Sequence, residues 1–145
     1  MSDFALTKKS NGLYDLDMSN NDLVLTNSLS NAVVLSLGTW ARDERLNDSA
    51  TIEPQIGGWF GNVLGDAFGS RIWKSFRDTL NSASVSRATA FAKDALKWLV
   101  DDGVAKSVDV NVTGFEGTKV YFNVVVNKPD ASGEEFRWQA NWEAV

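Results

Sequence analysis

The sequence predicts an α+β fold with an N-terminal β-hairpin, three helices and a C-terminal three-stranded antiparallel sheet. Apolar residues recur at helical spacing in three stretches between residues 28 and 103, while no period holds for long from 41 to 70. From residue 104 onward they alternate with polar residues, as in half-buried strands. The chain of 145 residues has the length of one domain. We therefore expect a single domain over 1–145, divided into a hairpin arm (1–27), a helical part (28–103) and a β-meander (104–145).

The hairpin is predicted from residues 12–27, which read GLYDLDMSNNDLVLTN. Apolar and polar residues alternate at Leu13, Asp15, Leu23 and Leu25, on either side of the polar stretch SNND. This pattern is typical of two antiparallel strands joined by a short turn.

Two helices are expected before and after a glycine-rich segment. The first covers about 29–41, and Asn27 or Ser28 can cap its start. The residues at helical spacing on one face of it are Leu29, Ala32, Val33, Ser36, Leu37 and Trp40. The second lies in SRIWKSFRDTL (70–80) and opens at Ser70. One face of this second helix would carry Ile72, Trp73, Phe76 and Leu80.

The third helix is expected within VSRATAFAKDALKWLVDDG, with Ser84 or Ser86 as its cap and Gly103 as its stop. Asp101 and Asp102 end this helix, where negative charge opposes the helix dipole. Two interpretations are equally open: a basic group of this chain or of a partner lies nearby, or the carboxylates are simply exposed. The apolar stripe of the helix comprises Ala88, Ala92, Ala95 and Leu99, widened by Phe91 and Leu96.

Three strands follow, joined by the turns GFEG and NKPDASGE, which are short enough for an antiparallel meander with one face on the helices. The residues expected on the buried face are Val108, Val110 and Val112 in the first strand, Val120, Phe122, Val124 and Val126 in the second, and Phe136, Trp138, Ala140 and Trp142 in the third.

The segment before the second helix contains glycines at every fourth position among bulky aromatics. A phosphate loop is excluded by its spacing, because Trp73 and not glycine precedes the Lys74-Ser75 pair. We expect an ordered loop over 53–70 in which glycines allow close backbone approach. Phe68 and Trp73 are expected to pack within the chain, and Trp59 and Phe60 to contact a partner.

The composition excludes several kinds of chemistry. The chain has no cysteine and no histidine, so it lacks Ser-His-Asp and Cys-His nucleophile systems and the usual zinc ligands. A net charge of -5 argues against nucleic-acid binding, and no apolar run is long enough to span a membrane. We expect no catalytic residue, no cofactor and no metal. One alternative is a lysozyme-like peptidoglycan hydrolase with a carboxylate pair drawn from RDERLND (42–48), Glu53 and Asp66.

Three stretches of the chain read DLVLTNSLSNAVVLSLGTWARDER, GGWFGNVLGDAFGSRIW and RATAFAKDALKWLVDDGVAKSVDV. Together they resemble the baseplate wedge family of Mu-like contractile-tailed bacteriophages. The resemblance runs from about Asp22 to Trp142 and includes the element Gly-Gly-Trp-aromatic-Gly, then Gly-Ser-Arg-hydrophobic-Trp, then Trp-Leu-x-x-Asp-Gly-Val. A Glu-Pro-Arg signature of the wider group, between the last helix and the sheet, is missing, because that junction reads DDGVAKSV.

The resemblance implies a structural component of the tail baseplate, similar in fold to the small wedge protein of T-even phages and its type VI secretion counterpart. It implies docking on a larger wedge protein, expected as a dimer, and a C-terminal sheet that templates the first ring of the tail sheath. Hub or spike proteins are further candidate partners. It also implies several copies in a sixfold assembly, made in the host cytoplasm and located in the virion, without nucleic acid or membrane contact.

The residues expected at a protein interface combine aromatic anchors with glycines of the loop. They are Gly57, Gly58, Trp59, Phe60, Arg71, Trp138 and Trp142.

Overall fold

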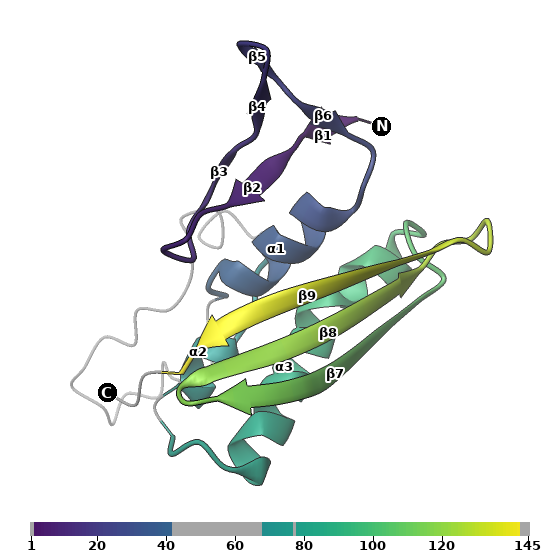
Figure 1. Cartoon of the computed structure of the whole chain (residues 1–145). Coiled ribbons are helices and arrows are strands. Elements are labelled where there is room, and N and C mark those ends of the chain that lie inside the picture. Colours follow the sequence, from purple (N-terminus) through teal and green to yellow (C-terminus); the bar gives the residue numbers. More distant parts are fainter. Residues whose placement is uncertain (1, 42–67, 77, 143–145) are drawn as a thin grey trace, which may run out of the picture.

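The computed structural model describes residues 2–41, 68–76 and 78–142, and all statements below concern these residues. Their fold is α+β, with a three-stranded antiparallel sheet that carries helices on one face (Figure 1). A group of short N-terminal strands projects on the far side of the first helix from the sheet (Figure 1). The structure thus confirms the predicted fold class, the helices and the C-terminal sheet.

The sheet consists of β7 (Ser107–Glu116), β8 (Lys119–Asn127) and β9 (Gly133–Asn141), in that order. The predicted alternation is confirmed most clearly in β8, whose core-facing side chains are fully buried, whereas the intervening residues are partly exposed. Each buried valine of such a strand contributes about 1.5–3 kcal/mol relative to an exposed one. These fully buried residues are Val120, Phe122, Val124 and Val126.

Helix α3 (Ser82–Asp101) packs against the sheet, mainly against β7. Its cap is Asn81, whose side chain accepts a hydrogen bond from the Ser84 amide at 2.9 Å. In return the Ser84 hydroxyl accepts one from the Asn81 amide at 3.0 Å. The prediction that Ser84 or Ser86 caps this helix is therefore wrong, because Ser84 is the third helical residue of a capping box. Gly103, with φ of 73°, follows the helix end as predicted.

Helix α2 (Ile72–Ser75) has four residues and is much shorter than expected. The chain does not continue as a helix beyond Ser75, and the residues after Phe76 form hydrogen bonds with other parts of the fold. The Asp78 carbonyl accepts a hydrogen bond from the Trp142 indole at 2.9 Å, and Asn81 is extended to cap α3. Helix α1 (Ser30–Gly38) is also shorter than the expected 29–41, since Thr39 is extended.

The N-terminal arm contains the predicted hairpin, formed by β4 (Met18–Ser19) and β5 (Asp22–Leu23). Asn20 and Asn21 make its turn with positive φ values of 51° and 65°. The residues before the predicted hairpin add two strands, β1 (Asp3–Phe4) and β2 (Leu6–Lys8). These pair with β6 (Leu25–Thr26) and β3 (Tyr14–Leu16), respectively.

The three ladders of the arm meet at a closed ring of backbone hydrogen bonds. Ala5 donates to the Val24 carbonyl (2.7 Å), Val24 donates to Asp17 (3.0 Å), and Asp17 donates to Ala5 (2.8 Å). The Asn31 amide of α1 donates to the Asp3 carboxylate at 2.8 Å and to the Phe4 carbonyl at 2.6 Å. The arm is thereby attached to the first turns of α1.

Within the described part of the chain, no helix combines the length and apolar character needed to cross a membrane.

Candidate protein-interaction site

A parallel backbone contact between Trp40 and Ser70 is the base of the candidate site. The Ala41 amide donates to the Ser70 carbonyl at 2.9 Å, and the Ser70 amide donates to the Thr39 carbonyl at 2.8 Å. The preceding Gly69 has φ of 105°, and a Cβ atom there would lie 2.6 Å from the Thr39 carbonyl oxygen. Glycine is therefore required at this position so that the two backbones can approach.

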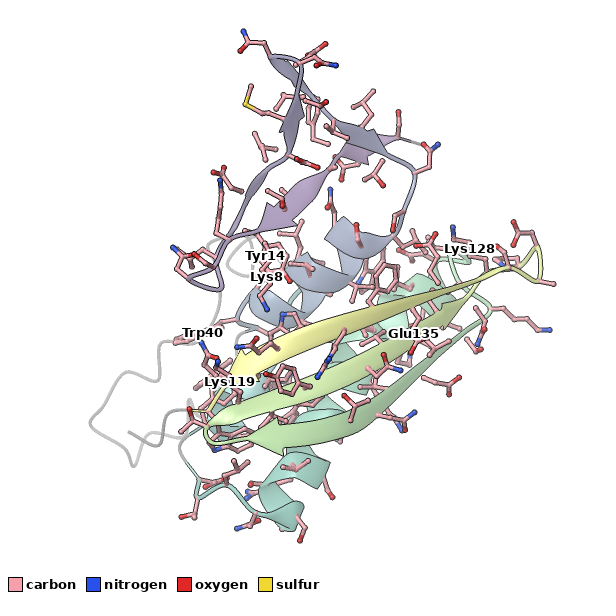
Figure 2. All side chains as sticks on the ribbon, in the orientation of Figure 1. Lys8, Tyr14, Trp40, Lys119, Lys128 and Glu135 are labelled. Carbon is pink, nitrogen blue, oxygen red and sulfur yellow. The ribbon has the colours of Figure 1, made fainter. Side chains whose placement is uncertain are left out.

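Trp40 and Trp73 stack on this base, with ring centroids 5.7 Å apart. Trp73 is 6% exposed and donates its indole N–H to the Ala41 carbonyl at 3.1 Å, whereas Trp40 remains 53% exposed. Trp40 points outward beyond the end of α1 (Figure 2). The stack therefore holds a large aromatic surface in the solvent with restricted freedom, which is favourable for binding another protein.

A cavity of about 150 Å³ lies beside the stacked pair, between α1, α2 and the end of β9. This cavity is partly open to solvent, and both apolar and polar atoms line it. The apolar side chains that line it include Leu37, Trp40, Ile72, Trp73, Phe76 and Trp138, and the polar ones include Gln139 and Asn141. We call this cavity together with Trp40 the tryptophan platform.

The predicted interface residues have different places in the structure. Trp138 lines the platform and also packs on Phe122, with ring centroids 5.7 Å apart. Arg71 lies next to the platform in the chain, but its guanidinium is directed to Asp94, 3.9 Å away. The remaining glycine and aromatic candidates, Gly57, Gly58, Trp59 and Phe60, lie outside the described residues.

Trp142 is a core residue and is only 2% exposed. Its ring contacts Phe76 edge-on at 5.4 Å, and its indole N–H is bonded to the Asp78 carbonyl. The structure thus corrects its expected place at an interface, because the side chain presents almost no surface to a partner. Trp40, which its helical spacing assigned to the first helix, is instead about half exposed.

Phe68 packs on Trp98, with centroids 6.3 Å apart, and Trp73 is buried in the stack, so both pack within the chain as expected. The acids considered for a hydrolase, RDERLND (42–48), Glu53 and Asp66, lie outside the described residues.

The C-terminal acids of α3 have a basic neighbour in their own chain. Lys97 lies 2.7 Å from Asp101 one helical turn later, which raises the pKa of Lys97 through the hydrogen bond and the nearby charge. For Asp101 the structure thus shows a nearby base of the same chain, whereas both Asp101 and Asp102 are also exposed, as the second interpretation expected.

Backbone hydrogen bonds at the two ends of the β8–β9 ladder show which residues of β8 direct their N–H and C=O groups toward β9. Trp142 donates to the Thr118 carbonyl at 2.6 Å, and Lys128 donates to the Ser132 carbonyl at 2.8 Å. The register between these bonds is continuous. Even-numbered residues of β8 therefore direct their backbone groups to β9, and odd-numbered residues direct theirs to β7.

The valines of β7 consequently direct their backbone groups away from the sheet. The residues opposite the odd-numbered positions of β8 are Ser107, Asp109 and Asn111, which bond inward to β8. The alternating residues, whose N–H and C=O groups point out of the edge, are Val108, Val110 and Val112. Among the described residues β7 pairs with β8 alone, and its ladder is interrupted by a bulge between Val112 and Gly114.

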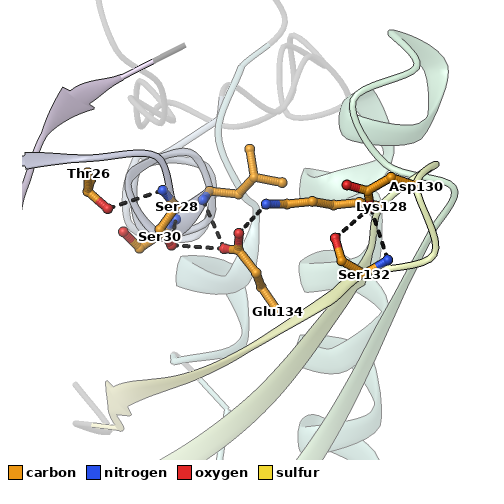
Figure 3. A network of polar contacts seen from close by, with 8 residues as sticks. Thr26, Ser28, Ser30, Lys128, Asp130, Ser132 and Glu134 are labelled. Atoms are coloured by element: carbon orange, nitrogen blue, oxygen red, sulfur yellow. Dashed lines mark hydrogen bonds and ion pairs between the residues drawn. The ribbon is translucent and has the colours of Figure 1, made fainter.

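The other edge strand, β9, is held by α1 and the arm. Glu134 accepts hydrogen bonds from the Ser28 hydroxyl at 2.8 Å and the Leu29 amide at 3.0 Å, and it pairs with Lys128 (Figure 3). Its partial burial raises the pKa of Glu134, but the bonds from Lys128, Leu29 and Ser28 outweigh this and the pKa is lowered. Lys8 of the arm also donates to Gln139 at 3.2 Å.

An exposed tryptophan beside a cavity of mixed lining, and a sheet edge whose outward backbone groups have no partner among the described residues, are features of a protein-binding module. The sequence profile of the family described as phage protein GP46 matches residues 29–133. The chain belongs to this family, and two named relatives confirm the resemblance to Mu-like phage proteins.

Two relatives match over nearly their full length. The chain is 38% identical over 144 residues to the Mu-like prophage FluMu protein gp46 of Haemophilus influenzae, with 98% of each chain covered. It is 28% identical over 149 residues to the baseplate protein gp46 of Escherichia phage Mu, with 100% of each chain covered.

Proposed function

We propose that the chain is a structural component of a contractile phage tail baseplate, where it docks on a larger wedge protein. The observation that carries this proposal is the tryptophan platform, in which an exposed Trp40 is stacked on Trp73 beside a partly apolar cavity. Buried aromatic anchors next to pockets dominate the binding energy of many interfaces. The relative from phage Mu is named a baseplate protein, and this name supports the proposed role in a baseplate.

The proposal places the chain in the virion, in several copies of a sixfold assembly, after synthesis in the host cytoplasm. The larger wedge protein, expected as a dimer, is its first partner. The partner contributes an apolar side chain that enters the cavity and packs against the exposed face of Trp40.

Co-expression with the larger wedge protein of the same phage tests the docking step. We expect a stable complex with the native chain, and a loss of about 2 kcal/mol of binding free energy with Trp40→Ala. Leu35→Ala is the matched control, because Leu35 is similarly exposed on α1 but does not line the cavity. Equal binding by both variants, or the absence of any complex with the native chain, would contradict the proposal.

We further propose that β7 receives a strand of the tail sheath protein and so templates the first sheath ring. An added strand would pair with the outward backbone groups of Val108, Val110 and Val112. The bulge before Gly114 limits this pairing to the first part of β7, since bulges disrupt a ladder. The edge formed by β9 is less suited to strand addition, because Leu29 at the start of α1 and Lys8 of the arm form hydrogen bonds to side chains along it.

Val108→Pro tests the sheath step, because proline removes an outward N–H group without breaking the β7–β8 ladder. Val108→Ala is the matched control, since it loses similar packing but keeps the N–H group. We expect baseplates with Val108→Pro to lack sheath in electron micrographs, while Val108→Ala supports it. Normal sheath on both would contradict strand addition at β7.

A further inference from the structure

The outer face of the sheet, opposite to the face on which α3 packs, carries polar side chains along β9. Arg137, Gln139 and Asn141 alternate with the inward-facing residues of this strand, so they share the outer face. Lys8 of the arm donates to the side-chain oxygen of Gln139 at 3.2 Å, and Gln139 donates to that of Asn141 at 3.0 Å. We call these four residues, Lys8, Arg137, Gln139 and Asn141, the donor patch.

The polar groups that the donor patch leaves open are N–H donors. The side-chain oxygens of Gln139 and Asn141 already accept hydrogen bonds within the patch, which leaves the side-chain N–H groups of Asn141. Among the described residues, neither Lys8 nor Arg137 forms an ion pair with a carboxylate. Ammonium and guanidinium groups have donors and no acceptor. A carboxylate, which only accepts, is therefore the side-chain group that complements the patch.

Glu135, the carboxylate two positions before Arg137 in β9, is bonded elsewhere. It accepts a hydrogen bond from the Asn123 side chain at 2.7 Å. The guanidinium of Arg137 lies over the ring of Tyr121, 4.2 Å from its centroid, and Tyr121 is the register partner of Gln139. Arg137 therefore leans along the sheet toward Gln139 and away from Glu135. The cation–π contact with the ring orients the positive charge of Arg137 toward the rest of the donor patch.

The donor patch adjoins the tryptophan platform. Gln139 and Asn141 belong to both, because they also line the cavity beside Trp40. Lys8 and Trp40 lie at the same end of the sheet, whereas Glu135 lies further along it (Figure 2). A partner that covers the platform therefore meets the cationic donors on the same surface. This surface fits a protein segment in which an apolar side chain and a carboxylate lie close together.

We propose that the donor patch binds an Asp or Glu carboxylate of the partner segment whose apolar side chain enters the cavity. This inference rests on the proposed function, because the partner is the larger wedge protein, and it adds the charge that the docking segment must carry. Arg137 offers a planar pair of N–H groups that binds a carboxylate at two points, and Lys8 adds a second positive charge from the arm. Charges across an interface mainly select the partner and its orientation. The arm therefore takes part in that selection through Lys8.

The affinity of the larger wedge protein for charge variants of the full chain tests the proposal. We expect Arg137→Glu to weaken binding about tenfold, because the carboxylate of the partner then meets a like charge. Lys93→Glu is the matched control, since Lys93 is exposed on α3 and the substitution makes the same change in net charge. Equal binding by these two variants, while Trp40→Ala binds more weakly, would overturn this inference and leave the docking step intact. If the native chain forms no complex, the docking step fails and this inference fails with it.

Salt dependence gives a second measurement, which a purely structural role of Arg137 would not change. We expect the native complex to weaken as the NaCl concentration rises, because salt screens charges at the surface. Arg137→Gln should reduce this dependence, whereas Lys93→Gln should leave it as in the native chain. An unchanged salt dependence in Arg137→Gln, with the variant folded by circular dichroism, would overturn the pairing with a carboxylate.

A photo-crosslinking residue at Lys119, incorporated into assembled tails, identifies the occupant of the patch. Lys119 is exposed and is the register partner of Asn141, but it is not counted in the patch because Glu116 is its register partner in β7. We expect crosslinks to a segment of the larger wedge protein in which Asp or Glu neighbours an apolar residue. Crosslinks to a second copy of this chain, to nucleic acid or to a segment without an acidic residue would overturn the inference. Tails that contain the chain and give no crosslink would also overturn it, whereas tails that lack the chain would overturn the proposed baseplate function together with it.

Discussion

Glu134 in β9 accepts a hydrogen bond from the backbone amide of Leu29, 3.0 Å away, at the start of α1. The same carboxylate oxygen accepts a bond from the Ser28 hydroxyl, and the other oxygen faces Lys128 (Figure 3). A residue of the C-terminal sheet thus caps the first helix, more than 100 positions earlier in the chain. This contact joins the sheet, α1 and, through α1, the arm.

We expect Glu134→Gln to lower the free energy of unfolding by about 1–3 kcal/mol, because it removes charge-assisted bonds in a partly buried site. Since the folded pKa of Glu134 lies below the unfolded value, its contribution is complete above pH 4.5 and is lost as the pH falls through the folded pKa. Urea unfolding at pH 7 and pH 3 measures both effects, and the variant should differ less from the native chain at pH 3.

Glu135→Gln is the matched control, because Glu135 is exposed on the outer face of the sheet and bonds to Asn123 there. This variant should change the free energy of unfolding by less than about 1 kcal/mol. An equal effect of the two substitutions at pH 7 would show that the cap formed by Glu134 is energetically unimportant.

Gly69→Ala should be strongly destabilising. The added Cβ atom would meet the Thr39 carbonyl oxygen at 2.6 Å, and φ of 105° is unfavourable for alanine. We expect a loss of about 2–4 kcal/mol in the free energy of unfolding, measured by thermal or urea denaturation.

We expect the opposite effect on the free energy of unfolding for Gly38→Ala. A Cβ atom at Gly38 meets no atom within 4 Å, and the residue ends α1 in ordinary helical geometry. This variant should be neutral or gain up to about 1 kcal/mol, since alanine favours the helix. A gain at Gly69 or a large loss at Gly38 would mean that the backbone approach at Ser70 is not as described.

Asn81→Ala should lower the free energy of unfolding by about 1 kcal/mol, because the amide of Ser84 loses its acceptor. Ser86→Ala is the control, since the Ser86 hydroxyl bonds only to the Ser82 carbonyl of its own helix and is exposed. The control should be neutral or slightly stabilising. If Ser86→Ala were the more damaging substitution, the cap would lie where the sequence pattern placed it.

The parts of the fold that these variants probe differ in how well they could be predicted from the sequence. The long helix α3 and the strands of the sheet were predicted well, because their apolar periods run over many residues and need no distant partner to be recognised. The choice of Asn81 over Ser84 as the cap depends on where the chain returns from α2. Along that return the Asp78 carbonyl bonds to the Trp142 indole, a contact between distant positions that local patterns do not contain.

The tryptophan platform was only partly predictable for the same reason. Trp138 was recognised as an anchor, but Trp40 was assigned to a helix face, because its stacking on Trp73 joins positions that only the tertiary fold brings together. The strands at residues 3–8 were missed because each is short and their pairing depends on the hydrogen-bonded ring at Ala5, Asp17 and Val24.

Trp142→Phe should separate stability from binding. The substitution removes the indole N–H that bonds to the Asp78 carbonyl and leaves space in the core beside Phe76, so we expect a loss of about 2–3 kcal/mol in the free energy of unfolding. Because Trp142 is 2% exposed, the folded fraction should bind the larger wedge protein with native affinity. Trp40→Ala is expected to show the reverse: about 1 kcal/mol of lost stability from the aromatic pair, and a larger loss of binding. Denaturation and affinity measured on the same two variants check this, and weakened binding by folded Trp142→Phe would return that residue to the interface.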